Sequence, residues 1–161
     1  MPQNTDQRIQ IIENLIEQKR LTTLAHTQYL AQNREYAPGE NLYMREVHFV
    51  MAVEPGEGRT MSELAQKLEV TQGAVSQLAA RLEKKGYVVR SKCSEDKRQI
   101  LATLTKKGED LYASHTQYDY ERFQALSQYY AIFTDEQLQT FALYEQMTRA
   151  IFTKISKQNN A

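Results

Sequence analysis

The segment from Met61 to Gly86, MSELAQKLEVTQGAVSQLAARLEKKG, constrains the fold more than any other part of the chain. Apolar residues recur every three or four positions on both sides of a short polar break, which predicts two amphipathic helices joined by a tight turn. Thr60 and Glu63 form a capping-box pattern at the start of the first helix, and Thr71 caps the second. Glu69 occupies the turn position that is often Gly. The sequence therefore predicts a helix-turn-helix.

The second of these helices presents short polar side chains over its first two turns. Val75 and Leu78 have the spacing of residues that pack on the first helix. A helix with a slim polar end fits the DNA major groove, where Gln bonds adenine and Ser or Thr bonds base edges or phosphates. We expect an inward face of Val75 and Leu78 supported by Leu64, Leu68, Val70 and Leu82, and a DNA-facing side of Thr71, Gln72, Gly73, Ser76, Gln77 and Arg81.

A hairpin follows the helix-turn-helix. The hydrophobic period changes from 3.6 to 2 in YVVRSK and QILATL, which are separated by the polar stretch CSEDKR. Two short strands with a charged tip directly after a recognition helix form a wing, whose cations reach the sugar-phosphate backbone or the minor groove. We expect Asp96 to orient Arg98 by a charge-assisted hydrogen bond. The predicted DNA-contacting cations of the wing are Arg90, Lys92, Lys97 and Arg98.

The charge distribution supports a nucleic-acid partner although the chain as a whole is neutral. From Arg59 to Lys107 there are eleven basic and five acidic residues, a net charge of +6, so the rest of the chain carries −6. A basic middle between acidic ends is a localised electrostatic footprint of the kind that attracts DNA.

The remaining segments read as helices. Pro38 and Gly39 interrupt the helical pattern in EYAPGEN, and Thr134 with Gln137 forms a second capping-box pattern. Thr105 has the place of a helix cap directly after the hairpin. Besides the helix-turn-helix, the expected helices cover residues 4–33, 42–53, 105–131 and 135–156.

The segment from Met61 to Leu111 resembles the winged helix of the MarR family of bacterial transcription regulators. The resemblance rests on SELA, LEKKGYV, the DKR of the wing and the following LTKKG, in that order and spacing. It implies that helices from both termini interleave with those of a second subunit, that the homodimer binds a pseudo-palindromic operator, and that a small ligand or oxidant changes the affinity. Carried over by position, Arg98 resembles the wing arginine, Asp96 its partner, and Ser76 and Gln77 groove-facing residues.

The expected fold is therefore mainly α, a single MarR-type domain over residues 1–161. The resemblance assigns residues 4–40 and 106–157 to the dimerisation helices and residues 42–105 to the winged helix-turn-helix DNA-binding part.

Three histidines raise the possibility of zinc as the effector. Neutral imidazole is a common transition-metal ligand. His48 and His115 resemble two ligands of the zinc-responsive repressors of the MarR family, His26 lies near a third, and Asp119 occupies the place of a fourth, where those repressors have His. The Cys of their second site has no counterpart. REVHFV also resembles the branch that senses acylated carriers, and ordinary hydrogen-bonded histidines are the plainer interpretation.

Ten tyrosines and one cysteine suggest other effectors. Tyrosine joins an apolar ring to a polar tip, which suits a pocket for an aromatic ligand and equally suits a helical dimer interface. Cys93 lies at the wing, whereas the reactive Cys of the family's peroxide sensors lies in the first helix, so we interpret Cys93 as incidental. The candidate pocket residues are Tyr29, Tyr43, His48 and Tyr112.

Other classes of protein lack support in the sequence. There is no Gly-rich phosphate loop, no pair of cysteines at metal spacing and no Ser in a glycine elbow, so we expect no enzyme and no required cofactor. No apolar run approaches membrane-spanning length and the start lacks a signal-peptide pattern, so we expect a cytoplasmic protein without a membrane partner. The sequence predicts a ligand-responsive transcription regulator, more a repressor than an activator, whose partners are double-stranded DNA, a second copy and a small effector. The alternative is a winged helix that binds protein.

Overall fold

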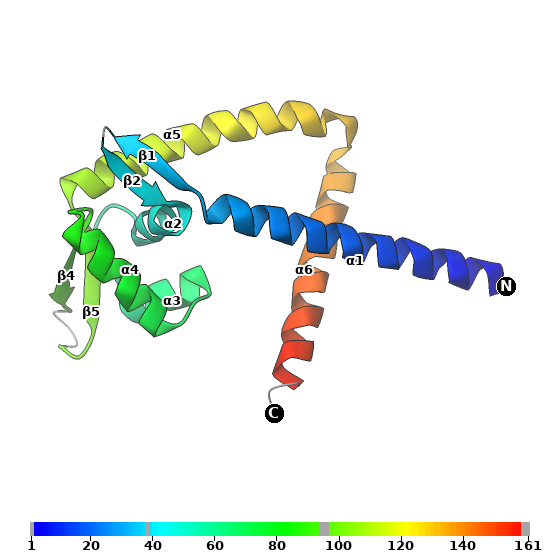
Figure 1. Ribbon diagram of the computed structural model, residues 1–161, viewed down its shortest axis with the longest axis horizontal. Helices are drawn as coiled ribbons and strands as arrows, with labels where there is room; N and C mark the ends of the chain where they lie inside the picture. Colours follow the sequence, from blue (N-terminus) through cyan, green and yellow to red (C-terminus); the bar gives the residue numbers. More distant parts are fainter. Residues whose placement is uncertain (1, 38, 94–96, 159–161) are drawn as a thin grey trace. The chain divides into compact units, whose positions relative to one another are not determined.

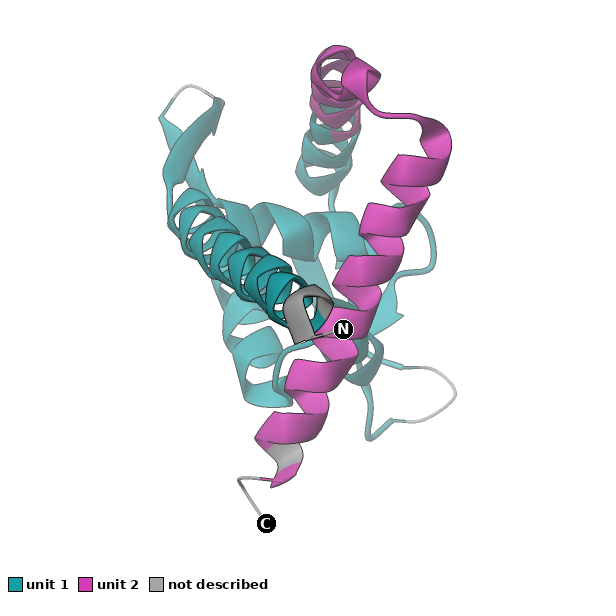
Figure 2. Ribbon diagram, turned by 90° about the vertical axis from the view of Figure 1, so that its right-hand side faces the viewer, with its two compact units in different colours: residues 1–115 teal, residues 116–161 magenta. Residues whose placement is uncertain are grey.

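The computed structural model describes residues 2–37, 39–93 and 97–158. The chain divides into two compact units, residues 1–115 and residues 116–161, which Figure 2 shows in different colours. The division falls inside the long helix α5 (Lys106–Tyr129), so this helix contributes its first turns to one unit and its remainder to the other. Among the described residues, no helix combines the length and the apolar character needed to cross a membrane.

The first unit contains a small helical domain with a wing (Figure 1). Its order of elements agrees with the predicted helix-turn-helix and hairpin, and it adds three short strands that were not predicted. In chain order the elements are α1 (Pro2–Leu30), β1 (Asn33–Ala37), β2 (Glu40–Tyr43), α2 (Met44–Val53), β3 (Arg59–Thr60), α3 (Met61–Leu68), α4 (Gln72–Lys84), β4 (Val88–Lys92), β5 (Ile100–Leu104) and the start of α5.

The core of this unit lies where α2, α3 and α4 meet. Phe49 of α2, Leu64 of α3 and Val75 of α4 are fully buried there. Burial of their apolar surface stabilises the folded state by about 25 cal/mol for each Å² removed from water. Leu78 packs against the same cluster, as the helical spacing predicted. The mutual packing of these three helices is what holds α4 in place.

Val70 does not belong to this core, and its predicted burial was wrong. Its side chain is 42% exposed. The reason is the turn between α3 and α4, where Glu69 adopts a left-handed conformation with φ of 54°. The backbone N–H of Val70 then donates to the carbonyl oxygen of Ala65, which closes α3 but leaves the Val70 side chain at the surface.

The polar residues at the helix starts have the predicted capping roles. Thr60 Oγ1 accepts a hydrogen bond from the Glu63 N–H at 3.3 Å, and the Glu63 carboxylate accepts from the Thr60 N–H at 2.8 Å. These contacts also lower the pKa of Glu63, chiefly through the backbone hydrogen bond from Thr60. Thr71 Oγ1 accepts from the Ala74 N–H at 3.2 Å at the start of α4, and Thr105 Oγ1 accepts from the Gly108 N–H at 3.2 Å at the start of α5.

The wing is a three-stranded antiparallel sheet in the order β3-β5-β4. β4 and β5 form the predicted hairpin, with Arg90 opposite Ala102. The two-residue strand β3 pairs with the other edge of β5, where Arg59 is also opposite Ala102. The wing is thereby joined through β3 to the start of α3, since Thr60 is both the end of β3 and the cap of α3.

A second hairpin, β1–β2, corrects the prediction that residues 34–41 are a plain break between helices. α1 ends at Leu30, and β1 and β2 pair antiparallel around a turn in which Gly39 has φ of 76°. Strands of five and four residues carrying several charged side chains show no clear alternation of apolar and polar positions, so the sequence pattern did not reveal them. The hairpin leads directly into α2.

The second unit contains the rest of α5, a short 3-10 helix η1 (Tyr130–Ile132) and α6 (Asp135–Gln158). The predicted capping box is present: Thr134 Oγ1 accepts from the Gln137 N–H at 3.3 Å, and the Gln137 carboxamide oxygen accepts from the Thr134 N–H at 2.9 Å. Phe133 packs edge-to-face on Phe141, with ring centroids 5.1 Å apart.

We expect Gly108→Ala to destabilise the fold. A Cβ at position 108 would lie 2.1 Å from the Tyr87 carbonyl oxygen and 3.3 Å from Leu104 Cβ, so the first turn of α5 would have to move. Overpacking of this kind typically costs about 1–3 kcal/mol, measurable as a lower midpoint of urea unfolding.

The matched control for this substitution is Gly73→Ala. This glycine is also helical, but an added Cβ meets only Thr71 Oγ1 at 3.9 Å, so its midpoint should stay equal or rise. Equal midpoints for the two variants would contradict the close approach of α5 to Tyr87.

Candidate nucleic-acid interface

The N-terminal half of α4 presents the predicted polar face to solvent. Gly73, Ser76 and Gln77 are exposed, whereas Val75 between them is fully buried. The side-chain amide of Gln72 is exposed too and donates to Ser62 Oγ of α3 at 3.2 Å. A helix end with small exposed residues can approach a phosphate or a base edge closely.

The same face continues toward the C-terminal end of α4. A shallow hollow of about 320 Å³ is lined by Gln77, Ala80, Arg81 and Lys84. Lys84 was not among the predicted DNA contacts. The signal was available in the sequence, because Gln77, Arg81 and Lys84 have the spacing i, i+4, i+7 of one helix face.

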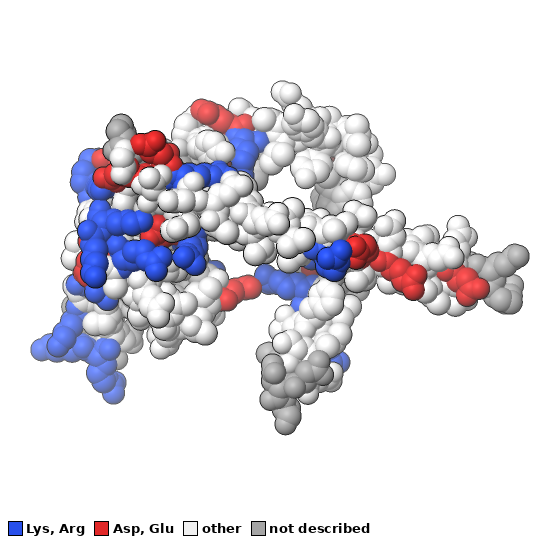
Figure 3. Space-filling view, viewed as in Figure 1, with Lys and Arg blue, Asp and Glu red and all other residues white. Residues whose placement is uncertain are grey.

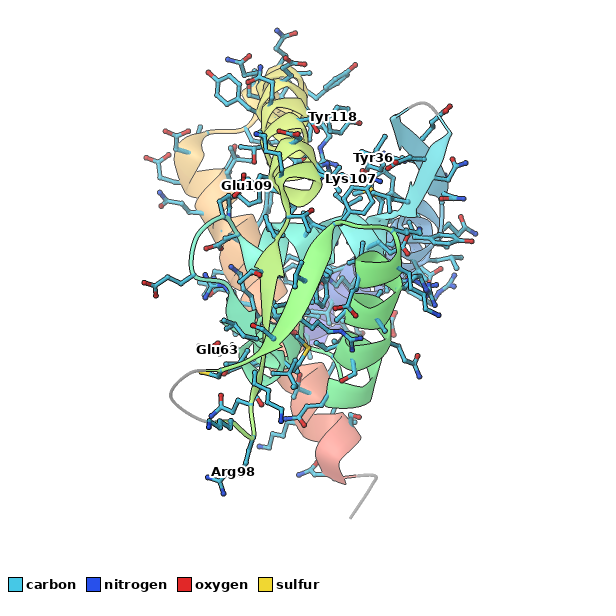
Figure 4. All side chains as sticks on the ribbon, turned by 90° about the vertical axis from the view of Figure 1, so that its left-hand side faces the viewer. Tyr36, Glu63, Arg98, Lys107, Glu109 and Tyr118 are labelled. Atoms are coloured by element: carbon cyan, nitrogen blue, oxygen red, sulfur yellow. The ribbon has the colours of Figure 1, made fainter. Side chains whose placement is uncertain are left out.

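The wing places three of its predicted cations at the surface. Lys92, Lys97 and Arg98 are exposed, and Figure 4 shows Arg98 pointing away from the strands at the end of the wing. The predicted partner of Arg98, Asp96, lies outside the described residues.

Arg90 is also on the wing but is committed to a contact within the protein. Its Nε and Nη2 atoms donate to the Glu83 carboxylate of α4 at 2.9 and 2.5 Å, and its backbone N–H donates to the same carboxylate at 3.1 Å. These hydrogen bonds hold the pKa of Glu83 below its usual range. The pair fastens the base of the wing to α4, so Arg90 fixes the position of the wing relative to the recognition helix.

The cations of α4, the wing and the start of α5 gather on one side of the first unit. Figure 3 shows Lys and Arg side chains over α4 and at the end of the wing, with few acidic residues between them. These cations belong to the segment from Arg59 to Lys107, whose net charge is +6. A basic surface around an exposed polar helix end is the electrostatic footprint expected for contact with a nucleic-acid backbone.

A buried carboxylate anchors the C-terminal end of α4, whereas the exposed polar side chains lie in its N-terminal half. Glu46 of α2 is fully buried. It accepts from Lys85 Nζ at 2.9 and 3.0 Å and from the Tyr43 backbone N–H at 2.9 Å, and Arg81 Nε lies 4.0 Å away. A buried charge needs such compensation because its desolvation is costly. The predicted DNA contact Arg81 is 44% exposed on its side chain, so it is reachable from solvent as well.

A second carboxylate anchors the loop before α3. Glu54 has φ of 62° and ψ of 153° at the end of α2, a backbone conformation that residues with a Cβ rarely adopt. Its carboxylate accepts from Arg59 Nη2 at 2.6 Å and from Lys67 Nζ, and the hydrogen bond from Lys67 is the main reason that the pKa of Glu54 is lowered. These contacts join α2, β3 and α3 around the strained loop.

The described residues of one chain do not bring the predicted zinc ligands together. No group of three or more His, Cys, Asp or Glu side chains among them could hold a metal ion. His26 and His48 are exposed, whereas His115 is buried with its ring centroid 6.0 Å from that of Tyr36. Asp119 belongs to the second unit.

Two adjoining cavities lie in the first unit away from the polar face of α4. Their volumes are about 450 and 430 Å³, and Glu40, Tyr87 and Lys107 line both of them. The predicted pocket residues Tyr29, Tyr43, His48 and Tyr112 are not among the described residues that line these two cavities. The sequence offered no signal for them, because the cavities are formed by the unpredicted β1–β2 hairpin.

Comparison with known proteins identifies relatives by sequence. Residues 44–99 match the model of the MarR family. An uncharacterized HTH-type transcriptional regulator of Bacillus subtilis, YhjH, is 27% identical over 120 residues, which cover 74% of this chain and 67% of the relative. The HTH-type transcriptional regulator SarZ of Staphylococcus epidermidis is 32% identical over 62 residues, which cover 38% of this chain and 42% of that relative. The match with SarZ thus spans less than half of its length.

Solved structures share the fold over most of the chain. The zinc-responsive MarR family member ZitR of Lactococcus lactis superposes with a TM-score of 0.66 at 20% identity, covering 88% of this chain and 99% of that one. FabT of Streptococcus pneumoniae, solved in complex with DNA, has a TM-score of 0.60 at 19% identity, covering 92% and 97%. At these identities the likeness establishes the winged-helix fold.

We expect Lys85→Met to destabilise the protein because it leaves the Glu46 carboxylate buried without its main cation. Breaking a buried ion pair costs about 3–5 kcal/mol, and we expect the lower end because the Lys85 side chain is 33% exposed. The neighbouring Lys84→Met removes the same charge from an exposed position and should leave the unfolding midpoint within the error of measurement. A Lys85→Met midpoint equal to that of Lys84→Met would show that the ion pair does not stabilise the fold.

Proposed function

We propose that the chain, whose residues 44–99 match the model of the MarR family, is a winged helix-turn-helix repressor of this family that binds a pseudo-palindromic DNA operator as a homodimer. Its affinity for the operator responds to a small effector. α4 enters the major groove, and the wing follows the adjacent backbone or minor groove.

The exposed polar start of α4 is the observation that carries this proposal. Gly73, Ser76 and Gln77 are exposed on a helix whose opposite face is fixed in the core by Val75. Glutamine pairs bidentately with adenine, and serine bonds several base edges or a phosphate. Arg98 at the end of the wing and Lys84 near the C-terminal end of α4 are further exposed cations of this unit. A surface for binding protein would not need this concentration of positive charge, so DNA is favoured over a protein partner.

Exposed apolar side chains on the terminal helices support a homodimer. Ile9, Ile12 and Ile16 of α1 are 41–50% exposed, and Ile151, Phe152 and Ile155 of α6 are 46–55% exposed. Apolar residues recurring at helical spacing on a helix surface mark a face that packs against another helix. A second copy of the chain supplies such helices, and the two-fold symmetry of a dimer matches a palindromic operator.

The regulatory mechanism is geometric. Two recognition helices must enter successive major grooves about 34–36 Å apart. The dimer has one state whose helix spacing fits the operator and one whose spacing does not. An effector that binds one of these states more tightly raises its population, by the ratio of the effector's affinities for the two states. Zinc is the second candidate effector, since His26, His48 and His115 resemble zinc ligands and a relative of the same fold is zinc-responsive.

The experiment that tests the proposed function is fluorescence anisotropy with the DNA upstream of the gene for this protein. The purified protein is titrated in EDTA and in added zinc, each at two salt concentrations, and its mass is measured by light scattering. We expect a dimer that binds this DNA far more tightly than random DNA, with an affinity that falls steeply as salt rises. A change on adding zinc would identify zinc as the effector. Equal, weak binding to both DNAs would contradict a regulator of this gene.

We expect Arg98→Ala to weaken operator binding and to lower the slope of log K against log salt by about one. The reason is that one phosphate contact, and the counterion it displaces, is lost. The matched control is Arg20→Ala, because the Arg20 guanidinium lies on α1 and pairs with Glu17 at 2.7 Å, so its loss should leave the salt slope unchanged. An unchanged slope for Arg98→Ala would remove the wing from the interface.

We expect Gln77→Ala to reduce the preference for the operator over random DNA by about 1–3 kcal/mol, the value of a bidentate contact with a base. Competition anisotropy with both DNAs measures this difference. If Gln77→Ala weakened binding to both DNAs equally, Gln77 would be a backbone contact and not a base reader.

A further inference from the structure

A hydrogen bond between α3 and α4 holds one side chain of the exposed polar face. Gln72, the first residue of α4, donates from its side-chain Nε2 to Ser62 Oγ in the first turn of α3 at 3.2 Å. Both residues are exposed. Because water can replace either partner of an exposed hydrogen bond, this contact adds little to the stability of the fold. Its effect is on the conformation of the Gln72 side chain.

The two helix starts that carry these residues are themselves fixed. The capping box of Thr60 and Glu63 closes the start of α3, and Thr71 caps the start of α4. α3 and α4 lie side by side in the first unit (Figure 1). A side chain that is anchored between two helices is placed more accurately than one on a loop. Ser62 can therefore hold the Gln72 carboxamide in one orientation.

The other exposed glutamine of this face, Gln77, differs in this respect. It lies five positions further along α4, and within the part of the chain that the structure describes its carboxamide has no hydrogen-bond partner. A glutamine that is free to rotate loses this freedom when it binds a base, which weakens binding. Gln72 has already lost part of that freedom in the unbound protein, so less affinity is lost when it binds.

The contact with Ser62 also limits which base Gln72 can bind. A glutamine carboxamide has two N–H donors and one oxygen that accepts. Ser62 takes one of the donors, so the oxygen and the second N–H remain. In the major groove adenine presents the matching pair, its N6 amino group as donor and its N7 as acceptor, whereas guanine presents two acceptors. The remaining groups of Gln72 therefore fit adenine and not guanine.

We infer that Ser62 is a positioning residue for DNA recognition, which orients Gln72 so that its carboxamide reads an adenine of the operator. This inference rests on the proposed function and adds two details to it. It names a base that the recognition helix selects, and it names a residue outside that helix on which the selection depends. Ser62 acts through Gln72 and not by a base contact of its own.

The first measurement uses the free protein and needs no DNA. The heteronuclear NOE of a side-chain amide, measured by NMR on ¹⁵N-labelled protein, reports how rigid the carboxamide is. We expect a higher value for Gln72 than for Gln77, and a fall to the Gln77 value in Ser62→Ala. Ser62→Thr keeps the hydroxyl and should keep the higher value. Equal values for the two glutamines in the wild type would overturn the inference.

The second measurement uses operator DNA in which each base pair of one half-site is changed in turn. Competition anisotropy measures the preference at each position. Gln72→Ala should lose a preference for adenine of about tenfold at one position, which corresponds to 1.4 kcal/mol. Ser62→Ala should lose about threefold at the same position, because an unheld Gln72 has to be ordered on binding. The preference at the position read by Gln77 should not change in Ser62→Ala.

The double variant separates positioning from an independent contact. Adding Ser62→Ala to Gln72→Ala should cause no further loss, because Ser62 acts only through Gln72. Additive losses, or an equal loss for every DNA, would make Ser62 a backbone contact and would overturn the inference. A wild type that binds the upstream DNA no better than random DNA would contradict the proposed function itself, and the NMR comparison would still decide whether Ser62 holds Gln72.

Discussion

The buried ion pair of Glu46 and Lys85 is the interaction on which the arrangement of the DNA-binding part depends. Glu46 has no exposed surface, and Lys85 Nζ lies 2.9 Å from it. The pair joins α2 to the end of α4 at a point where a change of either partner leaves an uncompensated charge. Because the Glu46 carboxylate is buried, the Lys85 ammonium has to stay beside it to compensate its charge. The ion pair therefore adds an anchor at the C-terminal end of α4 to the apolar packing along its length, while the polar side chains of its N-terminal half stay exposed.

Three further ionic contacts, separate from this pair, position the other parts of the proposed interface. Arg90 with Glu83 fixes the wing on α4, and Glu54 with Arg59 and Lys67 fixes the loop that leads into β3 and α3. None of these pairs is fully buried, so each alone stabilises the fold little. Their effect is positional: together they set the distance between wing and recognition helix. The proposed binding of DNA by both elements requires that distance to be constant.

Much of this architecture was predictable because it is encoded locally. Caps such as Thr60 and Thr71 act within one turn, and the alternation of apolar residues identifies a strand or helix within about ten positions. The exposure of Ser76 and Gln77 followed from the burial of Val75, since helix geometry leaves no choice once one face is assigned. The predicted burial of Val70 was wrong because it depended on the conformation of the turn. A hydrophobic pattern does not reveal the left-handed conformation of Glu69.

The sequence by itself determined the winged helix-turn-helix, its caps and the exposed polar face of α4, because each follows from short-range periodicity and hydrogen bonding. Only the tertiary structure decided which charged side chains pair within the protein and which remain exposed for a ligand. It placed Arg90 on Glu83 and Lys85 on Glu46, and it brought Glu40 to Tyr87 and Lys107, 47 and 67 positions away in the chain. Pairing between distant residues depends on how the elements pack, and a pattern of residue types along the chain carries no record of that packing.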